Sequence, residues 1–236
     1  MEIDALITSV DDPQLPRCLD AVMDQTVPFS KVIHLNNVCP TSEATNQGIA
    51  QSIGGWIMHI GGDMILNKNA LETAISYMDK NSSEKISGYY FGLYDTFLEC
   101  KIGYISILNG ELYRTLIFDD TPTCDSEIVR RIRRNGWKTV KKLNVLLGTH
   151  FDSPDEFQVF KRCYIHGIRY YGQPGKSLKI KLKELTRKKD DPLYHLGIKA
   201  IEYSEIKKYY PGSHNLTFDR KNYEEYLEGI NHYSNS

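Results

Sequence analysis

The feature that most constrains the fold is a short apolar run that ends in two glycines and an acid. Residues 56–60 read WIMHI, and the run stops at Gly61, Gly62 and Asp63. A segment this short and this apolar is typical of a strand buried on both faces of a parallel sheet. Ligands of open α/β sheets bind outside the carboxyl ends of the strands, so Asp63 lies where a site for a metal ion and phosphate would be built. The alternative is that these three residues form only a tight turn from the strand to a loop, with no functional role.

Two hydrophobic periodicities alternate along the chain, one typical of strands and one typical of helices. Strands are expected over 3–9, 31–36, 56–60, 86–93, 103–108 and 139–147, and helices over 15–24, 43–52, 69–78, 125–135 and 155–171. Right-handed crossovers make the first three strands a parallel, wound sheet. The turn around Asp95 indicates an antiparallel part farther along. The pattern predicts an α/β fold, a Rossmann-like wound mixed sheet flanked by helices, with a helical C-terminal extension.

Length and composition restrict the class of protein. The 236 residues suit one large α/β domain, or a core of ~150 residues with an appendage. There is no apolar run of about 18 residues that could span a membrane. The first residues carry acids where a signal peptide would carry Lys or Arg, and the five cysteines form no C-x-x-C pair. We therefore expect a cytoplasmic protein with reduced thiols and no membrane span.

Charge is distributed unevenly along a chain whose net charge is only −1. Residues 130–190 hold 17 basic and 5 acidic side chains, whereas residues 1–129 hold 7 basic and 18 acidic ones. A basic stretch of this kind is either a solvated face or a surface for a polyanionic partner such as DNA.

Five short segments occur in a fixed order within the first 150 residues. They are LITSV at 6–10, NQGIAQS at 46–52 followed by GGWIMHI at 54–60, GGD at 61–63, CDSEI at 124–128, and GTHF at 148–151. In this order they resemble the motifs of an inverting glycosyltransferase of family 2 with the GT-A fold. GGD stands in the place of the D-x-D motif, and CDSEI in the place of the segment that carries the catalytic base.

The resemblance implies a domain organisation and an activity. Residues 1–150 would form the GT-A catalytic domain, with the nucleotide-sugar half at about 1–66 and the acceptor half at about 85–150. Residues 151–236 would be a mostly helical extension packed on the same domain. The activity implied is transfer of a sugar from a nucleotide sugar, most simply a UDP-sugar, to a hydroxyl group with inversion at the anomeric carbon.

The resemblance also assigns the metal ligands and the base. Asp63 and His150 would hold a divalent cation that neutralises the charge developing on the diphosphate leaving group. A histidine ligand favours Mn²⁺ over Mg²⁺. Asp125 would take the proton from the acceptor hydroxyl. An acid at the start of a helix also stabilises that helix, so a capping role explains Asp125 and Glu127 as well.

The remaining candidates surround these three residues. Those expected to bind the donor are Thr8, Ser9, Asp11, Asn36, Asn46, Gly61 and Gly62. Those expected to bind the acceptor are Glu127, Gly110 and Glu111. The acceptor would be a saccharide or a lipid-linked glycan, and the basic segment 130–190 also permits a hydroxymethylated base in DNA, as in phage-type DNA modification.

Two departures from the family pattern keep other functions open. Gly61 replaces the first acid of D-x-D, and Asn36 replaces an aspartate that resembles a uracil-binding residue. The alternative is therefore a catalytically inactive GT-A module that binds a nucleotide sugar or nucleic acid. A nucleotidyltransferase would need a glycine- and lysine-rich loop after the first strand, and VDDP at 10–13 is not such a loop.

Overall fold

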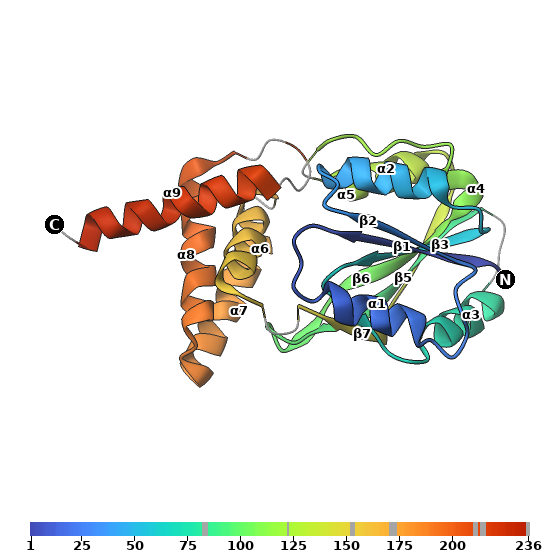
Figure 1. Ribbon diagram of the computed structural model, residues 1–236, viewed down its shortest axis with the longest axis horizontal. Coiled ribbons are helices and arrows are strands. Elements are labelled where there is room, and N and C mark those ends of the chain that lie inside the picture. Colours follow the sequence, from blue (N-terminus) through green and yellow to red (C-terminus); the bar gives the residue numbers. More distant parts are fainter. Residues whose placement is uncertain are drawn as a thin grey trace. The chain divides into compact units, whose positions relative to one another are not determined.

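The computed structural model describes residues 1–81, 85–121, 123–151, 154–169, 174–209, 212 and 216–234. The chain divides into two compact units. Unit 1 comprises Met1–Asp120 with Cys124–Asp152, and unit 2 comprises Thr121–Thr123 with Ser153–Ser236. The predicted α/β class is confirmed, because unit 1 is a mixed sheet flanked by helices (Figure 1).

Among the described residues of unit 1, seven strands form one sheet in the order β2-β1-β3-β6-β5-β7-β4. The strands are β1 (Ile3–Ser9), β2 (Lys31–Asn36), β3 (Trp56–Gly61), β4 (Met64–Leu66), β5 (Ile86–Asp95), β6 (Cys100–Asn109) and β7 (Lys138–His150). β1 is parallel to β2 and β3, and β7 is parallel to β5. β6 runs antiparallel to both β3 and β5. Consequently β1, β2, β3, β5 and β7 all end at the same edge of the sheet.

Helices cover both faces of this sheet (Figure 1). β1 is buried on both sides, with Ala5 and Ile7 facing one cluster and Leu6 facing the other. The first cluster contains side chains of α1 and α3, and the second contains side chains of α2, α4 and α5. The helices are α1 (Leu15–Met23), α2 (Thr41–Gln51), α3 (Ala70–Lys80), α4 (Gly110–Tyr113) and α5 (Cys124–Arg134). This double burial explains why the strands read as nearly continuous apolar runs.

Two features of the sheet differ from the sequence prediction. β4 was not predicted, and it pairs antiparallel with the end of β7, where Met64 lies opposite His150. β5 continues past a register shift between Phe91 and Leu93 and includes Asp95, which the prediction had placed in a turn. Three residues are too few to display a periodicity, and a bulge interrupts the alternation, so neither feature is visible in the sequence.

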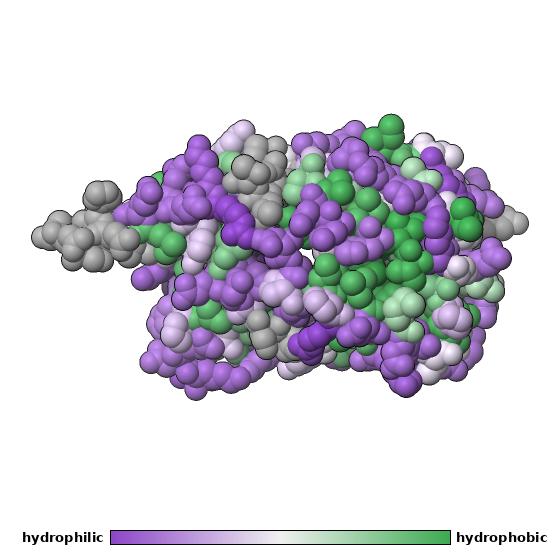
Figure 2. Space-filling model, viewed as in Figure 1, coloured by the Kyte–Doolittle hydropathy of each residue, from purple (hydrophilic) through white to green (hydrophobic). Residues whose placement is uncertain are grey.

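Unit 2 is mostly helical over its described residues, with α6 (Glu156–Arg169), α7 (Pro174–Lys189), α8 (Pro192–Lys207) and α9 (Leu216–Ser234). α6 matches the helix predicted over 155–171, except that residues 170 and 171 lie outside the described residues. Aromatic rings fill its core, where Phe160 contacts Tyr164, Tyr203 and Tyr226. In Figure 2, hydrophilic residues cover most of the visible face of this unit. In the part of the chain that the structure describes, no helix has the length and apolar character needed to cross a bilayer.

Candidate functional site

Polar side chains gather where the parallel strands of unit 1 end. β1 and β2 end opposite each other at Ser9 and Asn36, and Thr8 lies opposite Gly61 of β3. β5 and β7 end side by side at Asp95 and His150. Because these strand ends share one edge, residues that are far apart in the chain meet there.

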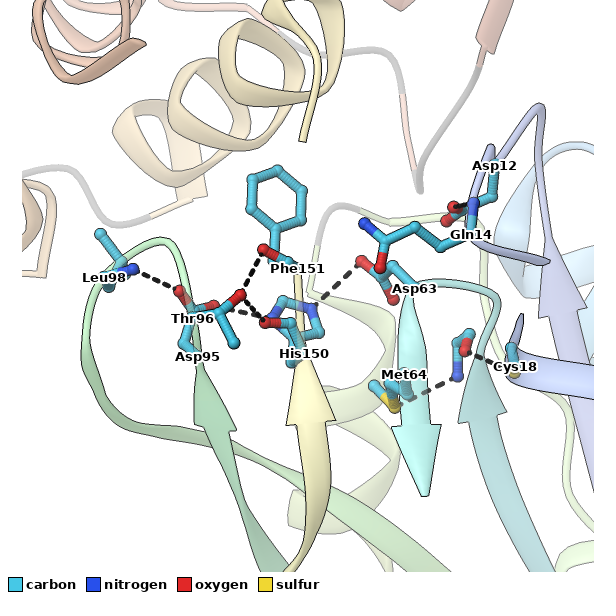
Figure 3. Close-up of polar contacts among 11 residues, drawn as sticks. Asp12, Gln14, Cys18, Asp63, Met64, Asp95, Thr96, Leu98, His150 and Phe151 are labelled. Atoms are coloured by element: carbon cyan, nitrogen blue, oxygen red, sulfur yellow. Dashed lines mark hydrogen bonds and ion pairs between the residues drawn. The ribbon is translucent and has the colours of Figure 1, made fainter. Parts of the chain in front are cut away.

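At this edge, a histidine at the end of β7 is held between two carboxylates (Figure 3). His150 Nδ1 lies 2.8 Å from Asp95 Oδ2, and His150 Nε2 lies 3.2 Å from Asp63 Oδ2. Asp95 is fully buried, and its Oδ1 accepts a hydrogen bond of 2.6 Å from the backbone N–H of Leu98. Asp63 is partly exposed and follows β3 in the turn to β4. The inner carboxylate therefore orients the ring, and the outer one faces the surface.

This donor set fits a divalent cation. A carboxylate oxygen only accepts, so the side of the ring that faces Asp95 carries a proton on Nδ1. Nε2 then faces a second carboxylate, Asp63, and that contact is favourable only with a proton or a cation between the two atoms. One imidazole and one carboxylate suit a metal such as Mn²⁺. The described residues contain no group of three or more such ligands, so phosphate oxygens and water would complete the coordination.

A buried thiol lies beneath the site. Cys18 Sγ donates to the carbonyl oxygen of Gly61 at 3.5 Å. Burial, and after it the negative charges of Asp63 and Asp12, raise the pKa of this thiol to about 12. At Gly62, a Cβ would come within 2.7 Å of the Ser9 Cβ, so glycine here lets the loops after β1 and β3 touch. The acids of both loops thereby contribute negative potential to one place, as a cation site requires.

The predicted donor residues at the ends of β1 and β2 bond to one another. Ser9 Oγ donates to Asn36 Oδ1 at 3.1 Å and lies 2.9 Å from His34 Nε2. Asp11 has a left-handed backbone with φ of 49°, and its N–H donates to Asn37 Oδ1 at 2.8 Å. These bonds fix the shape of the loop after β1.

The predicted base is on the second face of the sheet. Asp125 is exposed in the first turn of α5, with Glu127 partly exposed in the same turn. Its charge acts on His59 of β3, whose side chain lies 3.1 Å from the hydroxyl of Thr8. Burial lowers the pKa of His59 to about 4, and the charge of Asp125 opposes that shift. Asp125 is therefore within electrostatic reach of the strands that carry the predicted donor residues.

Asn46 is engaged elsewhere, and Gly110 and Glu111 lie at another part of the sheet. Asn46 on α2 donates to the Phe118 carbonyl at 3.0 Å and accepts from its N–H at 2.9 Å, so its amide fastens the loop before α5. Gly110 and Glu111 follow Asn109, which pairs with the first residue of β3. They lie at the opposite end of that strand from Asp63, a distance of roughly 15–20 Å along a strand of this length.

Two site residues were not predicted. Asp95 follows an apolar run just as Asp63 does, so the same rule applied to a longer β5 would have found it. Gln14 precedes α1 and is 5% exposed, and neither atom of its side-chain amide has a hydrogen-bond partner among the described residues. Figure 3 shows this amide directed toward Asp63. No sequence pattern marks Gln14, because its importance comes only from burial.

Comparisons with known proteins identify the fold. No protein-family model and no curated protein matches the chain. The structure of S. aureus TarS is 12% identical, with a TM-score of 0.52 over 79% of this chain and 43% of TarS. Residues 1–349 of TarS in complex with UDP give the same identity and TM-score over 71% of that chain. The mannosyltransferase PcManGT from Pyrobaculum calidifontis, in complex with GDP-Man and Mn²⁺, is 10% identical, with a TM-score of 0.54 over 86% of this chain and 73% of its own.

The likeness shows that the chain has the GT-A-type fold of glycosyltransferase structures, as the sequence predicted. The chain spans less than half the length of full TarS.

Proposed function

We propose that the protein is a metal-dependent inverting glycosyltransferase, related to family 2, that uses a nucleotide sugar. The observation that carries the proposal is the arrangement of Asp63, His150 and Asp95 at the carboxyl edge of a glycosyltransferase-type sheet. TarS with UDP and the mannosyltransferase with GDP-Man and Mn²⁺ support a nucleotide-sugar donor and a divalent cation. We favour a UDP-sugar and Mn²⁺.

Asp63 and His150 are the residues that would hold the cation. When bound, it would neutralise negative charge on the diphosphate as that group leaves. Gly61 and Gly62 would line the diphosphate with their backbone, because protein side chains already fill the space where each Cβ would lie. Thr8, Ser9, Asp11 and Asn36 would line the nucleotide side from the ends of β1 and β2.

Asp125 would act as the general base. It would accept the proton of an acceptor hydroxyl while that oxygen attacks the anomeric carbon and the bond from that carbon to the diphosphate oxygen breaks. A single displacement of this kind inverts the anomeric configuration. Such a base typically contributes a factor of about 10² to 10⁴ in rate. Glu127, two residues farther along α5, would orient the acceptor.

The acceptor we propose bears a hydroxyl group on a saccharide or on a hydroxymethylated base in DNA. For DNA, the candidate contacts are the exposed basic side chains in the last turn of α7, namely Arg187, Lys188 and Lys189. Arg131 of α5 is a weaker candidate, because it donates to the Ile117 carbonyl at 2.7 Å. Binding to DNA that weakens steeply with salt would support this acceptor, and no binding at low salt would remove it.

The test is nucleotide release from a panel of nucleotide sugars with Mn²⁺, together with donor binding. Asp63→Asn should lose metal-dependent binding, whereas Asp125→Asn should bind the donor and lose turnover by about 10² or more. Asp20→Asn, an exposed acid on α1, is the matched control. Donor binding without turnover in the wild type, unchanged in Asp125→Asn, would favour the inactive binding module instead.

A further inference from the structure

We propose that Asp95 is a positioning residue that fixes which ring nitrogen of His150 carries the proton, leaving Nε2 to face the cation. The inference deepens the proposed function and depends on its metal site. It concerns a buried residue that does not itself touch the donor or the acceptor.

The two oxygens of Asp95 have distinct hydrogen-bond partners. Oδ1 accepts from the Leu98 backbone N–H at 2.6 Å, and Oδ2 lies 2.8 Å from His150 Nδ1. A backbone N–H can only donate, and a carboxylate oxygen can only accept. With Asp95 ionised, Nδ1 therefore carries a proton, whichever species occupies the other side of the ring.

The ring cannot turn away from this arrangement easily. Asp95 and His150 are paired residues of the parallel strands β5 and β7. The next residue, Thr96, donates its backbone N–H to the His150 carbonyl at 3.2 Å and its hydroxyl to the Phe151 carbonyl at 2.9 Å. The imidazole also stacks on the ring of Phe151 with an interplanar angle of 22°. The strand pair thus holds both partners of the Nδ1 hydrogen bond.

Because Nδ1 is protonated, the lone pair available for a metal is on Nε2, which faces Asp63 at 3.2 Å. A carboxylate that holds a ligating histidine in this way commonly changes metal affinity by a factor of about 10 to 100 when it is replaced. Asp95 lies where such a group would act on the proposed metal.

An Asn at position 95 would move the proton of the ring from Nδ1 to Nε2 without turning the ring. Asparagine has one accepting oxygen and one donating NH₂ group. The oxygen must face the Leu98 N–H, because only the oxygen can accept this hydrogen bond. The NH₂ group then faces Nδ1, which must give up its proton in order to accept. The ring proton moves to Nε2, where it donates to Asp63 and prevents coordination. The substitution changes the shape of the side chain very little, so the consequence is chemical rather than steric.

The experiment measures the ring and the metal separately in the full chain. A long-range ¹H–¹⁵N spectrum, with the signal of His150 assigned through His150→Gln, reports which nitrogen is protonated. Electron paramagnetic resonance of Mn²⁺ titrated into the protein with UDP reports affinity. We expect a protonated Nδ1 in the wild type, a bare Nδ1 in Asp95→Asn, and Mn²⁺ binding weakened about 10- to 100-fold in that variant.

Asp4→Asn is the matched control, since Asp4 is also fully buried and accepts hydrogen bonds from Ile53 and Gly54 near the opposite end of the sheet. It should leave Mn²⁺ affinity unchanged. A bare Nδ1 in the wild type overturns the inference without any variant having to fold. Equal Mn²⁺ affinity in the wild type and Asp95→Asn also overturns it, while the proposed function stands. A wild type that binds no Mn²⁺ with UDP overturns the proposed function itself.

Discussion

Acidification should destabilise unit 1 through one histidine. Burial lowers the pKa of His59 from 6.5 to about 4 in the folded protein. Between these values the unfolded chain binds a proton that the folded chain does not, so stability falls as pH falls from 6.5 to 4. One pKa unit corresponds to about 1.4 kcal/mol, so the full loss from His59 is about 3 kcal/mol. The loss reaches about 3 kcal/mol at pH 4, where half of the folded molecules carry the proton, and it nearly vanishes above pH 7.

Urea unfolding at several pH values measures this effect. Both tryptophans, Trp56 and Trp137, belong to unit 1, so intrinsic fluorescence follows its unfolding. The matched variant is His59→Gln, which does not titrate and whose amide can still bond to the Thr8 hydroxyl. The wild type should lose about 3 kcal/mol more than this variant between pH 7 and pH 4.

Parallel pH profiles of the two proteins would refute the reasoning, as would an NMR titration of His59 near 6.5. The same titration tests the position of Asp125, whose charge raises the pKa of His59. In Asp125→Asn the pKa of His59 should fall below its wild-type value. An unchanged pKa would place Asp125 out of electrostatic reach of the strands.

Three further predictions follow from single contacts. Gln14→Met should raise the free energy of unfolding by about 1–3 kcal/mol, because it removes a buried amide that has no hydrogen-bond partner among the described residues; an equilibrium unfolding curve showing destabilisation contradicts this. Gly92→Ala should cost about 1–3 kcal/mol or more, since its Cβ would collide with the Leu143 carbonyl, and thermal unfolding at wild-type temperature would contradict it. In the native protein at pH 8, a thiol reagent should label exposed Cys39 well before Cys18, whose pKa is about 12; mass spectrometry that finds Cys18 modified first would contradict this.

Much of unit 1 could be predicted because its elements are long enough to show a period. The strands around residues 3–9, 31–36 and 56–60 were found from their apolar runs, and the position of Asp63 followed from the rule that ligands bind at the carboxyl ends of strands. The overall α/β class depends on just this information.

Other parts depend on three-dimensional contacts that a linear pattern does not contain. Motif order alone did not reveal that Gly110 and Glu111 follow a strand that runs antiparallel to β3, which moves them to the far edge of the sheet. The pairing of Asp95 with His150 requires the register of β5 and β7. In residues 173–236, polar and aromatic residues are mixed, so the sequence predicts a mostly helical extension but does not show where the three helices of the described part begin and end.

The strand pairing around His150 has a consequence for how the protein is made. Asp95 precedes its partner His150 by 55 residues, and Asp63 precedes both. A nascent chain that has emerged only as far as β6 contains the two carboxylates but lacks the ring that lies between them. β7 therefore brings His150, which contacts both acids, when it pairs with β5. The site therefore forms no earlier than the step in which β7 joins the sheet.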